Sequence, residues 1–374
     1  MRGDSAWAFQ ACLQHCHQTG CTYVIHASPS QQQAAQTCSD TCRRQRRDGA
    51  GSEAATGPGH SDGATAVDDL EVPLPLRIFR WSCADDCKYH CMRAVEAWKA
   101  VEGRNAPVEK YYGKWPFLRV LGMQELASVL ASLANLLAHA LCLSRLRAEA
   151  LRASPHARAS PLQAVVSPQP APVAAVHMPG YGNGSRSPYP FLWLWTAYGC
   201  LHINAWVWSA VFHSRDTRLT ERLDYTSAIC LVAFGLFAVL FRILWGPTRR
   251  RRLAAAAAGA AVAAGLARHL HYMLRVKFDY GWNMRVCVAA GLATAGLWLA
   301  WCWATRHPGR HRMYAFLLLA HTAMLLELLD FPPLAGLLDA HAAWHVATVA
   351  LTPLFYSWLR SDAAAALEPK RKDT

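Results

Sequence analysis

The chain has 374 residues, of which 53% are hydrophobic and only 17% are charged, and it contains 15 tryptophans. This composition is too apolar for a soluble protein of that length, and it predicts a membrane protein. The net charge of +13 does not indicate nucleic-acid binding, because most basic residues stand in short segments between apolar runs without a folded basic domain. Such charge instead sets the orientation of membrane helices near anionic lipid headgroups.

Residues 1–115 differ from the rest of the chain in their cysteine content. Cysteines this dense in a short polar segment predict a small lumenal domain with up to four disulfides, whose connectivity the sequence leaves open. A zinc knuckle is the alternative, because CxxxC recurs, but structural zinc sites more often use tighter CxxC pairs. The disulfide candidates are Cys12, Cys16, Cys21, Cys38, Cys42, Cys83, Cys87 and Cys91.

Two polar tracts interrupt the pattern. Residues 43–70 and 151–190 are rich in Ala, Gly, Pro and Ser and poor in large apolar side chains. Such segments bury too little apolar surface to offset the entropy of ordering. We expect the first to be a disordered insertion and the second a disordered cytoplasmic loop.

The region 116–360 contains apolar runs of the length needed to cross a bilayer. A hydrocarbon core about 30 Å thick needs roughly 20 apolar residues per helix. The sequence therefore predicts an all-α membrane protein, a seven-transmembrane-helix bundle. The expected spans are 118–142, 190–212, 225–245, 253–274, 283–304, 313–330 and 341–359.

Basic residues predict the orientation of these spans. Lys and Arg concentrate after the first, third, fifth and seventh spans, and such segments stay on the cytoplasmic side. The N-terminus is therefore expected in the lumen and the tail 361–374 in the cytoplasm. A lumenal N-terminal domain needs a signal peptide, yet the first residues lack an apolar core. Either the true start lies upstream or the first span translocates the tail, and we expect the former.

Three histidines stand at the ends of two spans and suggest a metal site. Ser209 lies four residues before His213, and His341 four before His345, so on helices each pair shares one face. Neutral imidazole is the commonest protein ligand of zinc, and three such ligands with one open position are typical of hydrolytic sites. The expected topology brings the ends of these spans to the lumenal face.

Nearby polar residues have predicted supporting roles. Asp224 is expected to orient or deprotonate a water molecule, and Ser209 to donate to a developing oxyanion. Asp216 and Asp339 are candidate partners for the second nitrogen of the imidazoles. A Ser/His/Asp triad with Ser209 as nucleophile is the rival scheme, but it leaves the second histidine pair without a role, and no GxSxG motif surrounds Ser209.

Two function classes are compatible with this pattern. One is a hydrolase of a lipid ester or amide, and the other is a seven-helix receptor or lipid-binding module with a structural zinc site. A structural site would be closed by a fourth protein ligand, so Ser209 and Asp224 beside three histidines favour catalysis. A transporter would call for inverted repeats or broken helices, which the sequence does not indicate.

The order of these residues also resembles a known family. The arrangement Ser-xxx-His, Asp, His-xxx-His resembles the seven-helix hydrolase superfamily of the alkaline ceramidases and progestin/adiponectin-type receptors, and within it the Per-one-like family. The resemblance covers nearly the whole chain apart from its start and the two polar tracts. The matching runs are CxxxC at 12–16 with Cys21, WSCADDCKYHCM at 81–92, GKWPF at 113–117, QELAS at 124–128, NAWVWSAVFHSRDTRLTERLDY at 204–225, FDYGWN at 278–283, and LLELLDFPP with LDAHAAWH in 325–345.

The resemblance implies a more specific function than the residues alone. It implies a zinc-dependent lipid hydrolase of the phospholipase A2 type that removes the sn-2 acyl chain from the inositol phospholipid of GPI-anchored proteins, in GPI fatty-acid remodelling. His213, His341 and His345 would bind the zinc, with Ser209 and Asp224 assisting the water. The implied substrates are GPI-anchored proteins among membrane lipids, and the implied location is the Golgi membrane, with the endoplasmic reticulum as alternative. A ceramidase-like amidase is the alternative activity, and the oligomeric state stays open.

Overall fold

The structure is a computed structural model of the chain, and it describes residues 3–22, 37–38, 41–42, 72–102, 106–152 and 189–367. The predicted insertion at 43–70, most of the predicted loop at 151–190 and the end of the tail lie outside the described residues. The chain divides into two compact units. The first comprises Met1–Val129, His213–Asp216 and Leu328–Ala343, and the second comprises Leu130–Phe212, Thr217–Glu327 and Trp344–Thr374.

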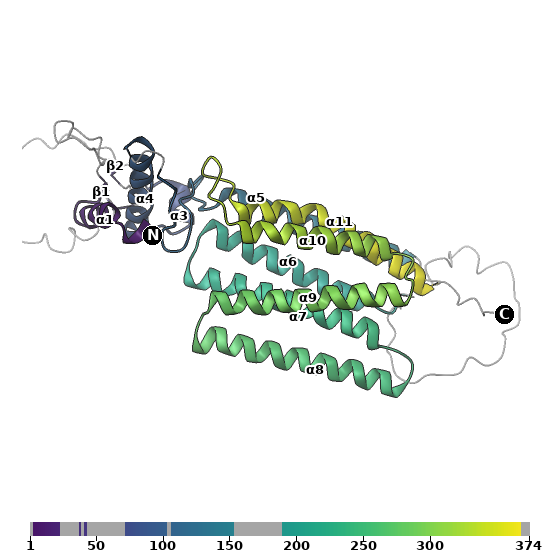
Figure 1. Ribbon diagram of the computed structural model, residues 1–374. Helices are drawn as coiled ribbons and strands as arrows, with labels where there is room; N and C mark the ends of the chain where they lie inside the picture. Colours follow the sequence, from purple (N-terminus) through teal and green to yellow (C-terminus); the bar gives the residue numbers. More distant parts are fainter. Residues whose placement is uncertain are drawn as a thin grey trace, which may run out of the picture. The chain divides into compact units, whose positions relative to one another are not determined.

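Two helices, α1 (Trp7–Thr19) and α4 (Cys83–Glu102), form the cysteine-rich part of the first unit (Figure 1). A four-residue spacing on a helix places two thiols on one face, one turn apart. The CxxxC pair of α1 therefore matches the CxxxC pair of α4, and the disulfides Cys12–Cys91 and Cys16–Cys87 connect antiparallel faces. Around them, Phe9, Val95 and Tyr111 form a buried core.

The remaining elements of this region are short. A 3₁₀ turn η1 (Gly3–Ser5) precedes α1, and α3 (Leu74–Ile78) precedes α4. The strands β1 (Cys21–Thr22) and β2 (Thr37–Cys38) form an antiparallel pair in which Cys21 is opposite Cys38. Cys21 is disulfide-bonded, so the predicted disulfide-rich domain is confirmed.

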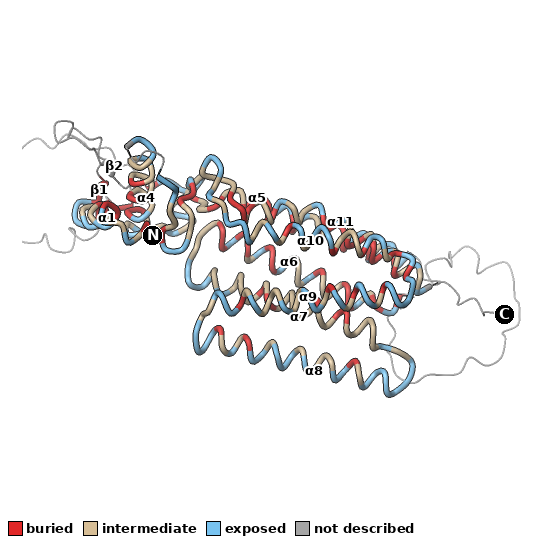
Figure 2. The backbone as a smooth tube through the Cα atoms, viewed as in Figure 1, coloured by how far each residue is buried: buried red, intermediate tan, exposed pale blue. Residues whose placement is uncertain are grey.

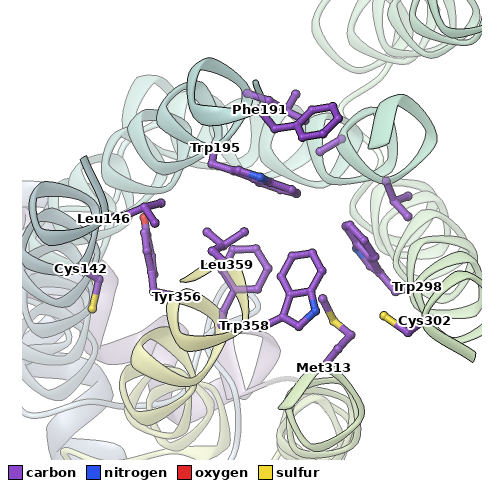
Figure 3. Packing of buried hydrophobic residues seen from close by; sticks show 14 of the residues in the cluster. Cys142, Leu146, Phe191, Trp195, Trp298, Cys302, Met313, Tyr356, Trp358 and Leu359 are labelled. Carbon is purple, nitrogen blue, oxygen red and sulfur yellow. The ribbon is translucent and has the colours of Figure 1, made fainter. Parts of the chain in front are cut away.

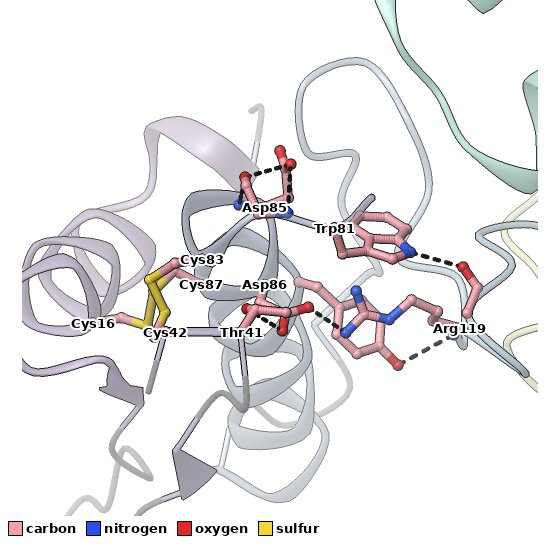
Figure 4. A network of polar contacts seen from close by, with 12 residues as sticks. Cys16, Thr41, Cys42, Trp81, Cys83, Asp85, Asp86, Cys87 and Arg119 are labelled. Atoms are coloured by element: carbon pink, nitrogen blue, oxygen red, sulfur yellow. Dashed lines mark hydrogen bonds and ion pairs between the residues drawn. A yellow bond between two sulfur atoms is a disulfide. The ribbon is translucent and has the colours of Figure 1, made fainter. Parts of the chain in front are cut away.

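A further disulfide joins Cys42 to Cys83, at the start of α4 (Figure 4). The sulfur of Cys42 also lies 3.8 Å from that of Cys87, which bonds to Cys16. Cys42, Cys83 and Cys87 therefore have the proximity of a metal site, but all three sulfurs belong to disulfides. In this part of the chain the disulfide interpretation replaces the zinc knuckle that was the alternative.

Seven long helices follow in the described residues. Their bounds are α5 (Leu126–Arg152), α6 (Leu192–Ser214), α7 (Arg218–Leu244), α8 (Arg249–His271, extended by the π-helical turn η4, Tyr272–Val276), α9 (Tyr280–Ala304), α10 (Arg310–Leu329) and α11 (Ala340–Leu367). Short polar side chains cap several of them: Thr217 begins α7 with a capping box, and Asp279 accepts a hydrogen bond from the Trp282 backbone at the start of α9.

Five helices in the described residues, α5, α7, α8, α9 and α10, are long and apolar enough to cross a membrane. Figure 2 shows that α8 is exposed along most of its length, and its buried residues are Ala255 and His269. Apolar surface of this extent is stable where lipid covers it. The all-α membrane fold is confirmed, whereas seven membrane crossings remain a prediction. The two long helices outside this set are α6, which carries Ser209 and His213, and α11, which carries His341 and His345.

The first helix differs from the prediction. The expected span 118–142 began before the helix does, because residues 118–125 form turns that are fixed by backbone hydrogen bonds between Val120 and Met123 and from Leu118 to Gly336. Helix α5 begins at Leu126 and continues to Arg152. At the other end of the chain, α11 extends to Leu367, past the expected end of the last span at 359.

Aromatic residues build the core of the second unit (Figure 3). The rings of Trp195, Trp298 and Trp358 pack with centroids 4.6 to 6.2 Å apart. Beside them, the fully buried carboxylate of Asp362 accepts hydrogen bonds from the guanidinium of Arg242 at 2.7 and 3.1 Å. Tyr189 and His307 complete its shell. A buried charge inside a helix bundle is stable only with such partners.

Candidate metal centre

The candidate ligands lie at the ends of two helices. His213 lies in the last turn of α6, and His341 and His345 lie in the first turns of α11. Asp339 precedes α11, and its Oδ1 accepts a hydrogen bond from the Ala342 backbone at 2.8 Å, which fixes where the helix begins. The sequence thus places one imidazole where one helix ends and two where the other starts.

The structure brings these three histidines together. Each offers a ring nitrogen, and the three nitrogens lie within 4.8 Å of one another. The rings of His213 and His341 have centroids 5.2 Å apart, and His345 follows His341 by one helical turn. His213 and His345 are each only 3% exposed. Buried imidazoles that converge in this way are unusual unless they share a ligand.

The donor set fits zinc. Zinc binds imidazole nitrogens at about 2.0 to 2.1 Å, so three ligands around a tetrahedral ion lie about 3.4 Å from one another. Nitrogens within 4.8 Å of each other can reach that spacing by small rotations of the side chains. His213 has a further feature of a ligand, because its Nδ1 lies 2.6 Å from Oε2 of Glu125. A carboxylate on one ring nitrogen orients the other toward a metal.

Glu125 is a partner of His213 that the sequence pattern did not indicate. It immediately precedes α5, and its backbone N–H donates to the His213 carbonyl at 3.0 Å. Its second carboxylate oxygen accepts from Lys114 at 2.8 Å. A carboxylate before an apolar run, in the run QELAS at 124–128, was the available signal. Spacing alone could not pair it with a histidine 88 residues away.

Lys114 connects Glu125 to Asp216. Its Nζ lies 2.8 Å from Glu125 and 3.0 Å from Asp216. Burial alone would raise the pKa of Glu125, but the charge of Lys114 and the hydrogen bonds from His213 and Lys114 outweigh it and hold that pKa below its ordinary value. Burial would lower the pKa of Lys114, but the two carboxylates raise it. Glu125 is therefore ionised, and it accepts hydrogen bonds rather than donating them.

The two aspartates that were predicted as partners of the imidazoles differ from each other in their surroundings. Asp216 contacts Lys114, and its backbone N–H donates to the Gln124 side chain at 3.3 Å. Asp339 is buried at the start of α11, where burial raises the pKa of its carboxyl group. Their contact with an imidazole stays a prediction.

Ser209 is buried one turn before His213 on α6. Its Oγ lies 3.0 Å from Oγ of Ser132 on α5. The two hydroxyls fix each other's orientation, and the helical spacing puts Ser209 on the same face of α6 as His213. A hydroxyl in this position can donate a hydrogen bond close to the imidazoles.

Asp224 lies in the second turn of α7 and is partly buried. The rings of Phe212 and Tyr225 pack with centroids 6.3 Å apart, so the first turns of α7 lie beside the last turn of α6. Asp224 is next to Tyr225 in the chain, and it therefore lies near the level at which α6 ends. This position fits the predicted role near the histidines without establishing a contact with them.

A buried amide orients α11 at His345. The side chain of Asn135 on α5 donates to the backbone carbonyl of His345 at 2.8 Å, and the ring of Trp206 on α6 packs edge-on against the imidazole, with centroids 5.1 Å apart. Asn135 is fully buried. Its amide also satisfies a carbonyl near the start of α11.

Known proteins are similar to this chain over most of its length. The GPI-specific phospholipase A2-like PGAP3 of Bos taurus is 37% identical over 294 residues, which cover 78% of this chain and 79% of the relative. The Post-GPI attachment to proteins factor 3 of Drosophila melanogaster is 37% identical over 75% of this chain and 74% of its own. The Protein PER1 homolog of Schizosaccharomyces pombe is 34% identical over 78% of each.

No solved structure matches the chain. The model of the Per1-like family matches residues 73–363, which include all three histidines, Ser209 and Asp224. With relatives of this identity and coverage, the chain is a member of the Per1-like family.

Proposed function

We propose that this protein is a zinc-dependent lipid hydrolase that removes the sn-2 acyl chain from the inositol phospholipid of GPI-anchored proteins. One observation supports the proposal above all others: three buried or half-buried imidazole nitrogens lie within 4.8 Å of one another, and one ring is oriented by Glu125. The substrate class is taken from relatives that are named GPI-specific phospholipase A2-like.

The proposed mechanism assigns a role to each group. His213, His341 and His345 would hold the ion. Bound zinc would supply a water of lowered pKa and polarise the ester carbonyl. Glu125 holds the Nδ1 proton of His213, so that Nε2 faces the ion, and Lys114 keeps Glu125 ionised.

Two further side chains would act on the reacting atoms. Ser209, oriented by Ser132, would donate a hydrogen bond to the oxyanion that forms at the ester carbonyl. Asp224 would accept the proton of the attacking water and deliver it to the leaving alcohol of the lysolipid. The products are then a free fatty acid and a lysolipid that remains attached to the protein.

A structural zinc site in a receptor is the competing proposal. In the described residues, the candidate metal-binding group consists of the three histidines. Structural zinc sites have four protein ligands. The identity to relatives named for phospholipase activity adds support for hydrolysis of an ester over hydrolysis of a ceramide-like amide.

We also propose that the N-terminal region faces the lumen of a secretory compartment, the Golgi by resemblance. Disulfides such as Cys12–Cys91 and Cys16–Cys87 form in oxidising compartments and are rare in the cytosol. The lumen also contains the GPI lipid, so this orientation places the enzyme on the side of its substrate. Protease protection of an N-terminal tag in intact vesicles tests the orientation.

The deciding experiment removes one proposed ligand. In cells that lack the endogenous activity, His341→Ala should leave the sn-2 chain on GPI-anchored proteins, and the purified variant should lose its zinc. Mass spectrometry of the GPI lipid and of the metal content measures both. The control is His271→Ala, which removes an exposed imidazole at the end of α8. Unchanged remodelling in His341→Ala would contradict the proposal.

A further inference from the structure

A pocket of about 200 Å³ lies in the same compact unit as His213. Its walls come from α4, from the turns at 111–124 and from the residues that follow α6. Four of its lining side chains are cations, Lys88, Lys114, Arg119 and Arg215, against two carboxylates. The aromatic lining residues are Trp81, Tyr89, Tyr111, Tyr112, Trp115 and Phe117.

Stacked side chains form part of the lining of this pocket, among them Trp81 and Arg119, which are labelled in Figure 4. The guanidinium groups of Arg119 and Arg215 lie 4.4 and 4.0 Å from the centroid of the Trp81 ring. The indole N–H of Trp81 donates to the Gly122 carbonyl at 2.8 Å, and Arg119 also stacks on Tyr89 at 4.2 Å. Each of these side chains has contacts on two sides, so this part of the lining is preorganised for a ligand.

Carboxylates pair with three of the four lining cations, because Lys114 contacts Glu125 and Asp216 and both arginines also have carboxylate partners. The fourth cation, Lys88, lies over an aromatic ring. Arg119 pairs with the buried Asp86 at 2.6 Å, and Arg215 pairs with Asp85 at 2.7 Å. The two arginines therefore hold the lining in place by ion pairs and stacking. The pocket can accept an anion at Lys88, beside its aromatic rings.

The rim of the pocket contains a strained, exposed aromatic residue. Tyr112 has φ +51° at the tip of the turn that Tyr111 and Lys114 close, and it is 53% exposed. A bulky residue with positive φ costs energy, and such strain persists most often at functional sites. Lys88 lies over this ring at 5.2 Å, and in the described part of the chain its ammonium contacts that ring rather than a carboxylate.

A chain of polar contacts links the pocket to the candidate metal centre. Lys114 lines the pocket, and its Nζ contacts Glu125, whose other oxygen contacts Nδ1 of His213. Asp216, the other partner of Lys114, is also a lining residue. Two polar contacts therefore link a lining residue of the pocket to a candidate metal ligand.

We propose that this pocket binds the sugar-phosphate headgroup of the lipid substrate, the glycan joined to inositol phosphate. Aromatic faces stack on the apolar C–H faces of sugar rings, and Lys and Arg side chains bind phosphate oxygens. An acyl chain would not use the four cations, and a phosphate ion would not use the six rings. The identity of the headgroup rests on the proposed function, whereas its chemical class follows from the lining residues.

Direct binding tests the proposal independently of catalysis. The probe is a soluble glycosyl-inositol phosphate without acyl chains, titrated calorimetrically into the full-length protein in lipid nanodiscs. Lys88→Gln and Tyr112→Ala should each weaken the Kd about tenfold, since each removes one charged or stacking contact. Tyr112→Phe keeps the ring and should bind like the wild type. Lys277→Gln removes an exposed lysine at the start of the α8–α9 connection and is the matched charge control.

The possible results separate the pocket from the proposed reaction. His341→Ala should lose deacylation and retain headgroup binding, because the pocket does not include that side chain. If the probe does not bind, or if Lys88→Gln and Tyr112→Ala bind it with the wild-type Kd, the pocket proposal is overturned while the hydrolase proposal stands. Inorganic phosphate or vesicles of plain phosphatidylinositol that compete equally well would also overturn it, because neither carries the glycan.

Discussion

Oε2 of Glu125 lies 2.6 Å from Nδ1 of His213, and it joins the residue before α5 to the last turn of α6. The Nδ1–H donates to the carboxylate, so the imidazole has a single tautomer with Nε2 as the potential metal ligand. The same carboxylate accepts from Lys114. One side chain thus sets both the orientation and the basicity of a proposed ligand.

Glu125→Gln should weaken zinc affinity about 10- to 100-fold without abolishing it, because the amide orients His213 less well than a carboxylate. Competition with a zinc chelator of known affinity measures the effect on the purified protein. Glu149→Gln changes an exposed carboxylate near the end of α5 and is the control. Equal affinity in both variants would show that Glu125 does not support a metal ligand.

Asp224→Asn should retain zinc and lose turnover, by about 10²- to 10⁴-fold, because an amide cannot accept the proton of a water molecule. Metal analysis and deacylation are measured on the same preparation. A variant that loses zinc outright would show that Asp224 is a ligand rather than a proton acceptor.

Ser209→Ala should lower the deacylation rate about 10²- to 10³-fold at unchanged zinc content, because it removes a hydrogen-bond donor to the oxyanion. Ser132→Ala should have a smaller effect, since Ser132 only orients the Ser209 hydroxyl. A Ser209→Ala enzyme with the full rate would exclude this role. A covalent acyl-enzyme trapped on Ser209 would instead support the triad scheme.

Asp362→Asn should destabilise the second unit by about 3 to 5 kcal/mol, because it leaves the guanidinium of Arg242 buried without its counter-charge. The melting temperature in detergent measures this loss. Asp279→Asn removes a half-buried carboxylate that caps α9 and should cost about 1 kcal/mol or less. Similar melting temperatures for both variants would show that the Asp362 network contributes little.

Replacing Cys12 and Cys91 together by Ser should destabilise the first unit by about 2 to 5 kcal/mol, since their bond closes a long loop between α1 and α4. Limited proteolysis measures the increased opening of this region. Replacing the buried Cys302 of α9, which is a free thiol, is the control. Equal protease resistance would show that the remaining bridges are sufficient.

The sequence predicted the helical membrane fold and the convergence of His213, His341 and His345, because helical period and span length are local properties. It did not predict Glu125 as the partner of His213. A single carboxylate has no periodicity that indicates its partner, and contacts between distant segments follow from tertiary packing. The same reason applies to disulfide pairing, where eight cysteines left the connectivity open until α1 and α4 were found antiparallel.

The start of α5 was misplaced for a related reason. Hydropathy extended the first span back to residue 118, but backbone hydrogen bonds to distant segments hold Leu118 and Glu125 outside the helix. An apolar run does not reveal which of its residues have partners elsewhere in the chain. The seven predicted crossings depend on α6 and α11, which are not among the five helices of the described residues that are long and apolar enough to cross a membrane.

The disulfide between Cys42 and Cys83 fixes the two ends of the chain segment that contains the 43–70 tract. When the two ends of a segment are held together, the entropic cost of closing it rises by only about 0.6 kcal/mol for each doubling of its length. This position can therefore gain or lose residues during evolution without loss of the helix pair, and a fluorescent reporter domain inserted there should leave the cysteine-linked helices intact.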